Sequence, residues 1–278
     1  MMWNTLPCAP ATGRTAAPAT PRRSLIDLLA PLEALTRTSA SLVRNPGAAF
    51  DLGGENCELP RYLFVGPHGG AATLRVGLFA ALHGDEPEGA HAIVRFLSLL
   101  EASPEPALGY SLFVYPVCNP TGFEDRTRET RDGRDWEAEL SAAEPGPEVR
   151  WLRSELAARS FHGLITLRTD AQATGFHAVA GGATLAKHLL RPVLDEVENL
   201  LPIDERALID GFHARAGRVP DAGRSAFGAA KPGRPRPFEI TLHMPRALPT
   251  YVQEMAFVLA LRSILQEYRK LIAYAQDI

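Results

Sequence analysis

Apolar residues recur along this chain at two spacings, and segments of the two kinds alternate. Short, continuous apolar runs predict buried strands, and apolar residues three and four positions apart predict helices. The predicted strands are Arg61–Val65, Arg75–Leu82, Tyr110–Val117, Gly163–Leu167, His177–Ala180 and Phe238–Leu242. The predicted helices are Ser24–Leu42, Glu88–Leu100, Glu148–Arg159, Ala183–Leu201 and Tyr251–Ala275. This alternation predicts an α/β fold, with a mostly parallel, twisted central sheet flanked by helices on both faces.

The chain begins with a segment of different composition. Residues 1–23 are rich in Ala, Pro and Thr and end in the pair Arg22 and Arg23. We expect a disordered N-terminal tail over 1–23 and a single domain over 24–278. The basic pair follows this segment instead of preceding an apolar run, which is not typical of a secretory signal.

The composition restricts the classes of partner. The chain has 278 residues, of which 46% are hydrophobic, and its formal net charge of -3 gives no basic field for nucleic acid. No apolar run has the length of a membrane span. The cysteines, Cys8, Cys57 and Cys118, are widely spaced and favour a reducing compartment over a disulfide framework. We therefore expect a cytoplasmic protein without nucleic-acid or membrane partners, and the sequence leaves its oligomeric state open.

Polar residues that can bind ligands or take part in catalysis stand just beyond the ends of predicted strands. They are His83, Asn119, Arg168 and His243. Because open α/β sheets bind their ligands in a crevice at the carboxyl ends of the strands, we expect these four residues to lie near one another.

The first of these positions belongs to a recognisable motif. The segment Gly77–Pro87, which reads GLFAALHGDEP, resembles the first zinc motif of the metallocarboxypeptidase superfamily, including its aspartoacylase and succinylglutamate desuccinylase branch. A histidine and a glutamate three residues apart, His83 and Glu86, can turn a nitrogen and an oxygen toward one metal ion. We expect Gly84 to let the chain bend between them. Taken alone, the motif also fits a strand-to-helix turn with capping acids.

A second motif strengthens the resemblance. Tyr115–Phe123 is similar to the family's strand that ends in Asn-Pro-x-Gly, and Arg128 matches its carbonyl-polarising arginine. The likeness extends from about Arg61 to the C-terminus. It implies a zinc carboxypeptidase or amidohydrolase, acting on peptides or N-acyl amino acids, with Asn119 and Arg128 in the substrate site.

Other positions depart from the family pattern. Arg168 stands where the resemblance implies the third zinc ligand, and a guanidinium has no lone pair to offer a metal. His243 stands at the position where the family has its general-base glutamate. In the substrate-binding loop Asp135 is retained, whereas Glu137 replaces an asparagine. We expect Asp135 and Glu137 to line the substrate site.

Three hypotheses follow. In the first, the protein is a catalytically inactive homologue in which Arg168 pairs with Glu86 in place of zinc, and Arg128 helps to bind a small molecule or peptide bearing a carboxylate. In the second, His83, Glu86 and His243 form a rebuilt zinc site of an active hydrolase, with Glu137 or another acid as base. In the third, the final helix binds a protein partner. His177 lies near the family's substrate crevice and is a further candidate for lining it.

Overall fold

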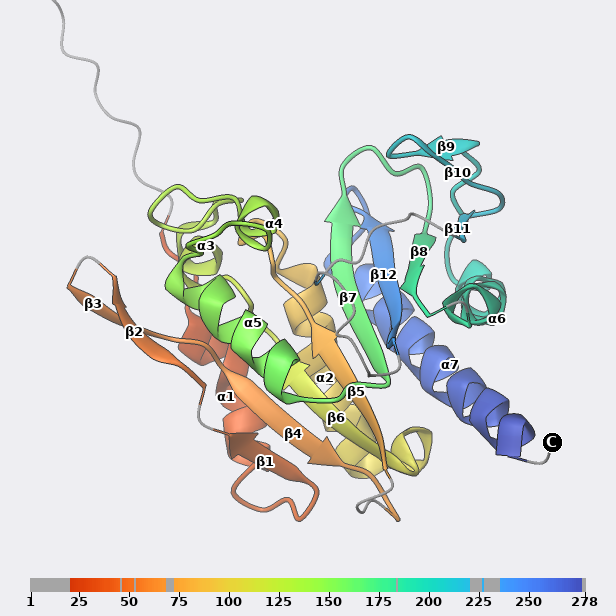
Figure 1. Cartoon of the computed structure of the whole chain (residues 1–278), viewed down its shortest axis with the longest axis horizontal. Helices are drawn as coiled ribbons and strands as arrows, with labels where there is room; N and C mark the ends of the chain where they lie inside the picture. Colours follow the sequence, from red (N-terminus) through yellow and green to blue (C-terminus); the bar gives the residue numbers. More distant parts are fainter. Residues whose placement is uncertain are drawn as a thin grey trace, which may run out of the picture.

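An eight-stranded sheet, with the strand order β1-β4-β6-β5-β7-β12-β8-β11, forms the centre of the fold (Figure 1). The computed structural model describes residues 21–276, apart from 46, 53, 69–72, 184, 221–226 and 228–235. The sheet strands are β1 (Leu42–Asn45), β4 (Arg61–Val65), β5 (Leu74–Phe79), β6 (Tyr110–Tyr115), β7 (Gly163–Asp170), β8 (His177–Gly182), β11 (Arg218–Val219) and β12 (Phe238–Pro245). Strands β6, β5, β7 and β12 are parallel, whereas β1, β4 and β8 join the sheet through antiparallel pairs.

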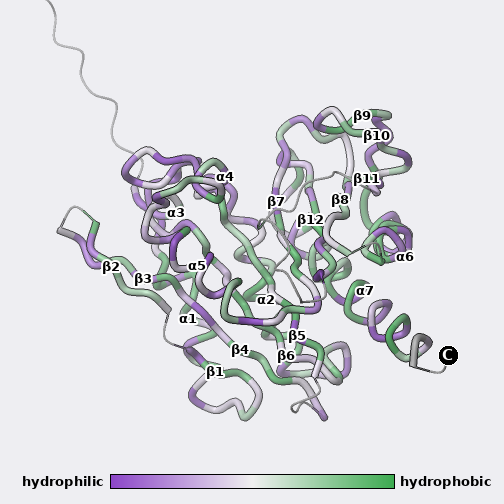
Figure 2. The backbone as a smooth tube through the Cα atoms, viewed as in Figure 1, coloured by the Kyte–Doolittle hydropathy of each residue, from purple (hydrophilic) through white to green (hydrophobic). Residues whose placement is uncertain are grey.

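Helices cover both faces of this sheet. They are α1 (Leu25–Leu35), α2 (Glu88–Ala102), α3 (Pro120–Asp125), α4 (Trp136–Glu139), α5 (Pro147–Ala158), α6 (Ala186–Glu198) and α7 (Thr250–Gln276), with a 3-10 turn at Glu105–Ala107. Helices α1, α2, α6 and α7 share one large apolar core with the sheet. Residues of α4 and α5 join a second, aromatic core, in which the rings of Phe79 and Tyr115 stack 4.8 Å apart. Figure 2 shows the hydrophobic residues along the central strands and many hydrophilic ones on the loops around α3 and α4.

The predicted fold class is confirmed, because the sheet is mixed but mostly parallel and has helices on both faces. The first helix is shorter than expected. It begins after Ser24, whose side chain accepts a hydrogen bond from the Asp27 N–H at 3.0 Å, but it ends at Leu35, and the chain then forms β1. The sequence pattern also missed the hairpin of β2 (Ala49–Leu52) with β3 (Glu55–Glu58), and the strand β9 (Leu208–Ile209), which pairs with β10 (Phe212–His213).

The expected tail divides into two parts. Residues 1–20 lie outside the described residues. The end of that segment is held against the domain: Arg22 pairs with Glu55 and Asp125, and Arg23 donates to the carbonyl oxygen of Gly84 at 2.6 Å. Arg22 and Arg23, at the end of the expected tail, therefore contact the domain. None of the described helices combines the length and the apolar character that crossing a membrane requires.

Candidate functional site

The carboxyl ends of β5, β7 and β12 meet at one edge of the sheet, and several of the predicted site residues gather there. Strand β12 aligns His243 with Arg168 of β7 on one side and with His177 of β8 on the other. Neighbours in register point to the same face of a sheet, so these three side chains form a row. His83 follows β5 and reaches the same place, since its ring nitrogen lies 2.6 Å from a nitrogen of Arg168.

The loop that carries His83 and Glu86 is shaped by its backbone. Ala81 adopts a left-handed φ of 47°, which turns the chain at the end of β5. At Gly84 the reason for glycine is close packing: a Cβ there would lie 1.9 Å from the carbonyl carbon of Gly122. The loop is therefore pressed against the start of α3, and this contact fixes both site residues.

Arg168 holds the centre of the site. Its Nε donates to Glu86 Oε2 at 2.9 Å, and its Nη2 donates to Glu86 Oε1 at 3.1 Å. The same Nη2 lies 2.6 Å from Nδ1 of His83, and Nη1 donates to Glu137. The guanidinium thus occupies the space on which the His83 nitrogen and the Glu86 carboxylate converge.

The ring of His83 lies between two possible partners. Its Nδ1 is 2.6 Å from Arg168 Nη2 and 2.9 Å from Glu86 Oε1. A guanidinium only donates hydrogen bonds and a carboxylate only accepts them, so Nδ1 hydrogen-bonds one or the other according to its tautomer. Nε2 is buried and has no hydrogen-bond partner among the described residues.

Burial and pairing act in opposite directions on the charges of this pair. Burial raises the pKa of Glu86, but the contact with His83, the Arg168 cation and the Thr169 N–H together lower it well below its usual range. Burial also lowers the pKa of Arg168, and the negative charges of Glu86 and Glu137 more than compensate. Both groups are therefore ionised, as a buried ion pair requires.

Two of the predicted substrate-binding residues cap short helices. Asn119 is fully buried; its oxygen accepts from the Gly122 N–H at 2.8 Å, and its nitrogen donates to the carbonyl of Arg128 at 3.2 Å. One oxygen of Asp135 accepts from the N–H groups of Glu137 and Ala138 at the start of α4. Asn119 thus shapes the loop that carries Arg128, and Asp135 orients the helix that carries Glu137.

Arg128 and Glu137 are the more exposed members of the site. Arg128 donates to Asp135 at 3.0 Å, and its Nη2 lies 3.9 Å from Glu137 Oε2. The Arg128 and Glu137 side chains are 48% and 49% exposed, against 11% for Arg168. Arg128 and Glu137 are therefore more accessible to solvent than Arg168.

His243 takes part in a different group of residues. Its ring stacks on the ring of His177, with centroids 4.5 Å apart and planes 6° from parallel. Burial, together with the neighbouring His177 and Arg168, holds the pKa of His243 well below its usual value, so its ring is neutral. Behind it, Nδ1 of the fully buried His177 lies 3.6 Å from the Asp204 carboxylate, which Arg206 also contacts.

The donor set fits a zinc ion poorly. Within the described residues, the triads whose ligand atoms converge within 4.8 Å are His83–Asp85–Glu86 and His83–Asp135–Glu137, and neither contains His243. Structural and catalytic zinc sites need at least three electron-pair donors. Here Arg168 lies against the ligand atoms of both motif residues and places a permanent positive charge between them. The residues at this site therefore do not fit the ion that the motif implies.

The sequence did not reveal every member of the site. Arg246, which follows β12, pairs with Asp85 at 3.0 Å and lies 3.9 Å from Glu86. The only signal for it is its place shortly after His243, beyond the predicted strand Phe238–Leu242. Asp204 had no signal, since it follows α6 in a segment without regular periodicity.

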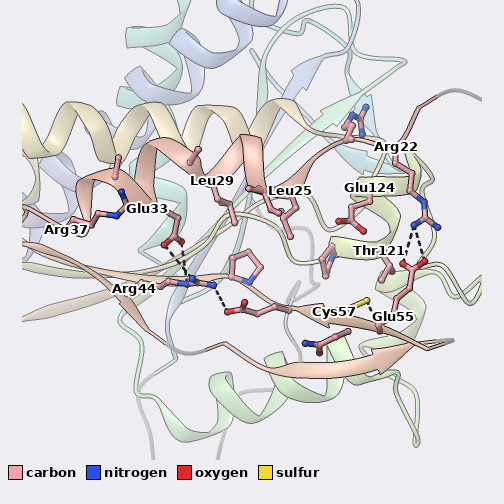
Figure 3. Close-up of a pocket in the computed structure, with 18 residues that line it drawn as sticks. Arg22, Leu25, Leu29, Glu33, Arg37, Arg44, Glu55, Cys57, Thr121 and Glu124 are labelled. Atoms are coloured by element: carbon pink, nitrogen blue, oxygen red, sulfur yellow. Dashed lines mark hydrogen bonds and ion pairs between the residues drawn. The ribbon is translucent and has the colours of Figure 1, made fainter.

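A separate cavity of about 870 Å³ lies between α1 and the β2–β3 hairpin (Figure 3). We refer to it as the α1 groove. Leu25 and Leu29 line its middle, and charged residues stand at its ends. Those charges include ion pairs between side chains of the groove itself, Arg22 with Glu55 and Arg44 with Glu33 and Glu58.

No family model and no curated protein sequence matches the chain, whereas many solved structures are similar to it. A "putative metallopeptidase" from Shewanella denitrificans superposes with a TM-score of 0.68 at 17% identity, over 87% of this chain and 90% of that one. A metallo-carboxypeptidase from Pseudomonas aeruginosa, in complex with (2-guanidinoethylmercapto)succinic acid, gives a TM-score of 0.61 at 16% identity, over 87% and 68%. Bovine thrombin-activatable fibrinolysis inhibitor, in complex with tick carboxypeptidase inhibitor, gives a TM-score of 0.64 at 14% identity, over 90% of this chain and 98% of that one. The chain thus has the carboxypeptidase-like α/β fold.

Proposed function

We propose that this chain is a carboxypeptidase-like protein that does not hydrolyse peptide or N-acyl bonds, and that its crevice binds a ligand bearing a carboxylate. The observation that carries the proposal is the position of Arg168. Its Nη2 lies 2.6 Å from His83 Nδ1 and 3.1 Å from Glu86 Oε1, at the point where those two groups would share a metal.

The absence of hydrolysis follows from what Arg168 replaces. A zinc ion lowers the pKa of its bound water and polarises the scissile carbonyl as a Lewis acid. A guanidinium supplies charge and hydrogen bonds, but it has no vacant coordination position for water or for a carbonyl oxygen. His243 is neutral and close by, yet in this arrangement there is no activated water for it to deprotonate.

Binding of a carboxylate is supported by the half-exposed arginines around the crevice. Arg128 and Arg246 are 48% and 40% exposed and flank the buried Arg168. Arginine binds carboxylates through paired, charge-assisted hydrogen bonds. The similar Pseudomonas aeruginosa enzyme is seen with a succinic acid derivative, which supports the same class of ligand here.

The rebuilt zinc site, with His83, Glu86 and His243, has less support. It requires Arg168 to leave a buried ion pair with Glu86 and requires the His243 ring to leave its stack on His177. Breaking one buried ion pair costs about 3–5 kcal/mol.

Metal content tests the proposal directly. We expect protein purified without chelator to contain far less than one zinc per chain by mass spectrometry, and to show no turnover of C-terminal peptide or N-acyl amino acid substrates. Arg168→His replaces the cation by a third electron-pair donor, so this variant should bind zinc. Arg191→His, on the exposed face of α6 where the side chain is 76% exposed, controls for an added histidine and should not. Stoichiometric zinc together with turnover in the unmodified protein would overturn the proposal.

A further inference from the structure

The carboxylate of Glu137 lies between two guanidinium groups from different parts of the fold. One oxygen accepts a hydrogen bond from Arg168 Nη1 of β7, and the other lies 3.9 Å from Nη2 of Arg128, which follows α3. Arg168 is 11% exposed and Arg128 is 48% exposed, so the two cations form the floor and the rim of one subsite. A carboxylate of the chain itself already occupies that subsite.

Glu137 differs from the other carboxylate on Arg168 in how firmly it is held. Glu86 is 4% exposed and also accepts a hydrogen bond from the Thr169 N–H at 2.9 Å, whereas the Glu137 side chain is 49% exposed. Glu137 is carried by α4, a helix of four residues. An exposed ion pair contributes little net stability, so releasing Glu137 costs far less than releasing Glu86.

The charges around the subsite also favour exchange. The candidate site brings four carboxylates, those of Asp85, Glu86, Asp135 and Glu137, next to three guanidinium groups, those of Arg128, Arg168 and Arg246. A carboxylate ligand added to this set meets a net negative surrounding. If the ligand displaces Glu137 toward solvent, the ligand carboxylate gains both arginines as partners and has no Glu137 charge beside it.

We infer that Glu137 is an internal competitor for the carboxylate subsite between Arg128 and Arg168. The ligand carboxylate binds on these two arginines, next to the position that the motif assigns to a metal, and Glu137 must leave for it to bind. The subsite therefore takes small carboxylic acids or the free carboxylate of a peptide. This inference rests on the proposed carboxylate-binding function and adds the residue that sets its affinity.

The test is calorimetric titration of the full chain with two probes, succinate and (2-guanidinoethylmercapto)succinic acid. Glu137→Gln keeps the shape of the side chain and removes its charge, so both probes should bind about tenfold more tightly or better. Glu144→Gln removes the same charge from an exposed loop between α4 and α5, and the ion pairs found among the described residues join Arg128 and Arg168 to other carboxylates. That control should change the affinity by less than about twofold if the effect is local. Adding Arg128→Met to Glu137→Gln should abolish the gain.

The outcomes separate the inference from the function on which it rests. If the unmodified protein binds the probes and Glu137→Gln binds them no more tightly, the internal competitor is refuted and carboxylate binding stands. If neither protein binds either probe, both are refuted. An equal gain in Glu144→Gln would assign the effect to net charge and would also refute the inference. A gain confined to Glu137→Gln, lost with Arg128→Met, supports it, because a merely structural residue would lower affinity when replaced.

Discussion

Two regions of this molecule carry clusters of arginine and glutamate, and they differ in burial. At the candidate site, Arg168 and Glu86 are 11% and 4% exposed and share two hydrogen bonds. At the end of the α1 groove, Arg22 and Glu55 are 53% and 52% exposed, although their closest atoms are only 3.2 Å apart. Both are arginine–glutamate pairs, and their largest difference is the access of water.

The difference teaches which of the charges belongs to the folding of the domain. A buried carboxylate that loses its cation keeps the full cost of having left water, whereas an exposed one is solvated again. Arg168 therefore compensates a buried charge of the folded domain. Breaking the exposed Arg22–Glu55 pair costs much less, because both groups are solvated again.

The largest predicted effect comes from Arg168→Met, which keeps the length of the side chain and removes its charge. Glu86 then remains buried without its cation, so we expect the free energy of unfolding to fall by about 3–5 kcal/mol. Urea denaturation monitored by circular dichroism measures this. Arg22→Met is the matched control from the groove and should cost less than about 1 kcal/mol. Equal losses in the two variants would contradict the contrast drawn from burial.

The contrast was partly predictable from the sequence. Continuous apolar runs located the buried strands near whose carboxyl ends these side chains lie. His83 follows β5 as expected, whereas Arg168 and His243 lie within their strands, because β7 continues to Asp170 and β12 to Pro245. The identity of residue 168 alone predicted an arginine cation beside the expected metal ligands His83 and Glu86. Strand positions and residue identities depend on short segments of the chain, so a single sequence is enough to predict them.

What the sequence could not supply was geometry between distant segments. The stacking of His177 on His243 depends on the register of β8 against β12. The β2–β3 hairpin has no fully buried residue in β2 and one in β3, Cys57, so it leaves little apolar alternation to detect. Asn119 was assigned to the substrate site from the motif, and only the structure shows that its side chain caps α3 and supports the Arg128 loop.

A second, smaller effect concerns pH. The folded pKa of Glu86 lies below its unfolded value, so its ionised form adds stability above about pH 4.3, and this is lost as the pH falls below that value. We expect Glu86→Gln to be less stable than the unmodified protein by about 2 kcal/mol at neutral pH, with the difference shrinking in acid. Urea denaturation at a series of pH values gives both curves.

Glu148 provides a control of opposite sign. It is 2% exposed, and burial raises its pKa, so its ionised form costs stability as the pH rises above the unfolded value. Glu148→Gln should therefore be neutral in acid and stabilising at neutral pH. For each variant, the measured quantity is its free energy of unfolding relative to the unmodified protein. If this difference changed in the same direction with pH for both variants, the hydrogen bonds and charges around Glu86 would not outweigh the cost of its burial.

The smallest predicted effect belongs to the exposed pair of the α1 groove. A double-mutant cycle on Arg22 and Glu55 should give a coupling free energy of about 0.2–1 kcal/mol. Because the two side chains are half in solvent, about 1 M salt should screen most of it. The same cycle on Arg168 and Glu86 should retain most of its larger coupling in salt, since water and ions do not reach that pair. A coupling free energy above about 2 kcal/mol for Arg22 and Glu55 that persists in salt would equal that expected of a buried pair. Burial would then not explain the difference between the two pairs.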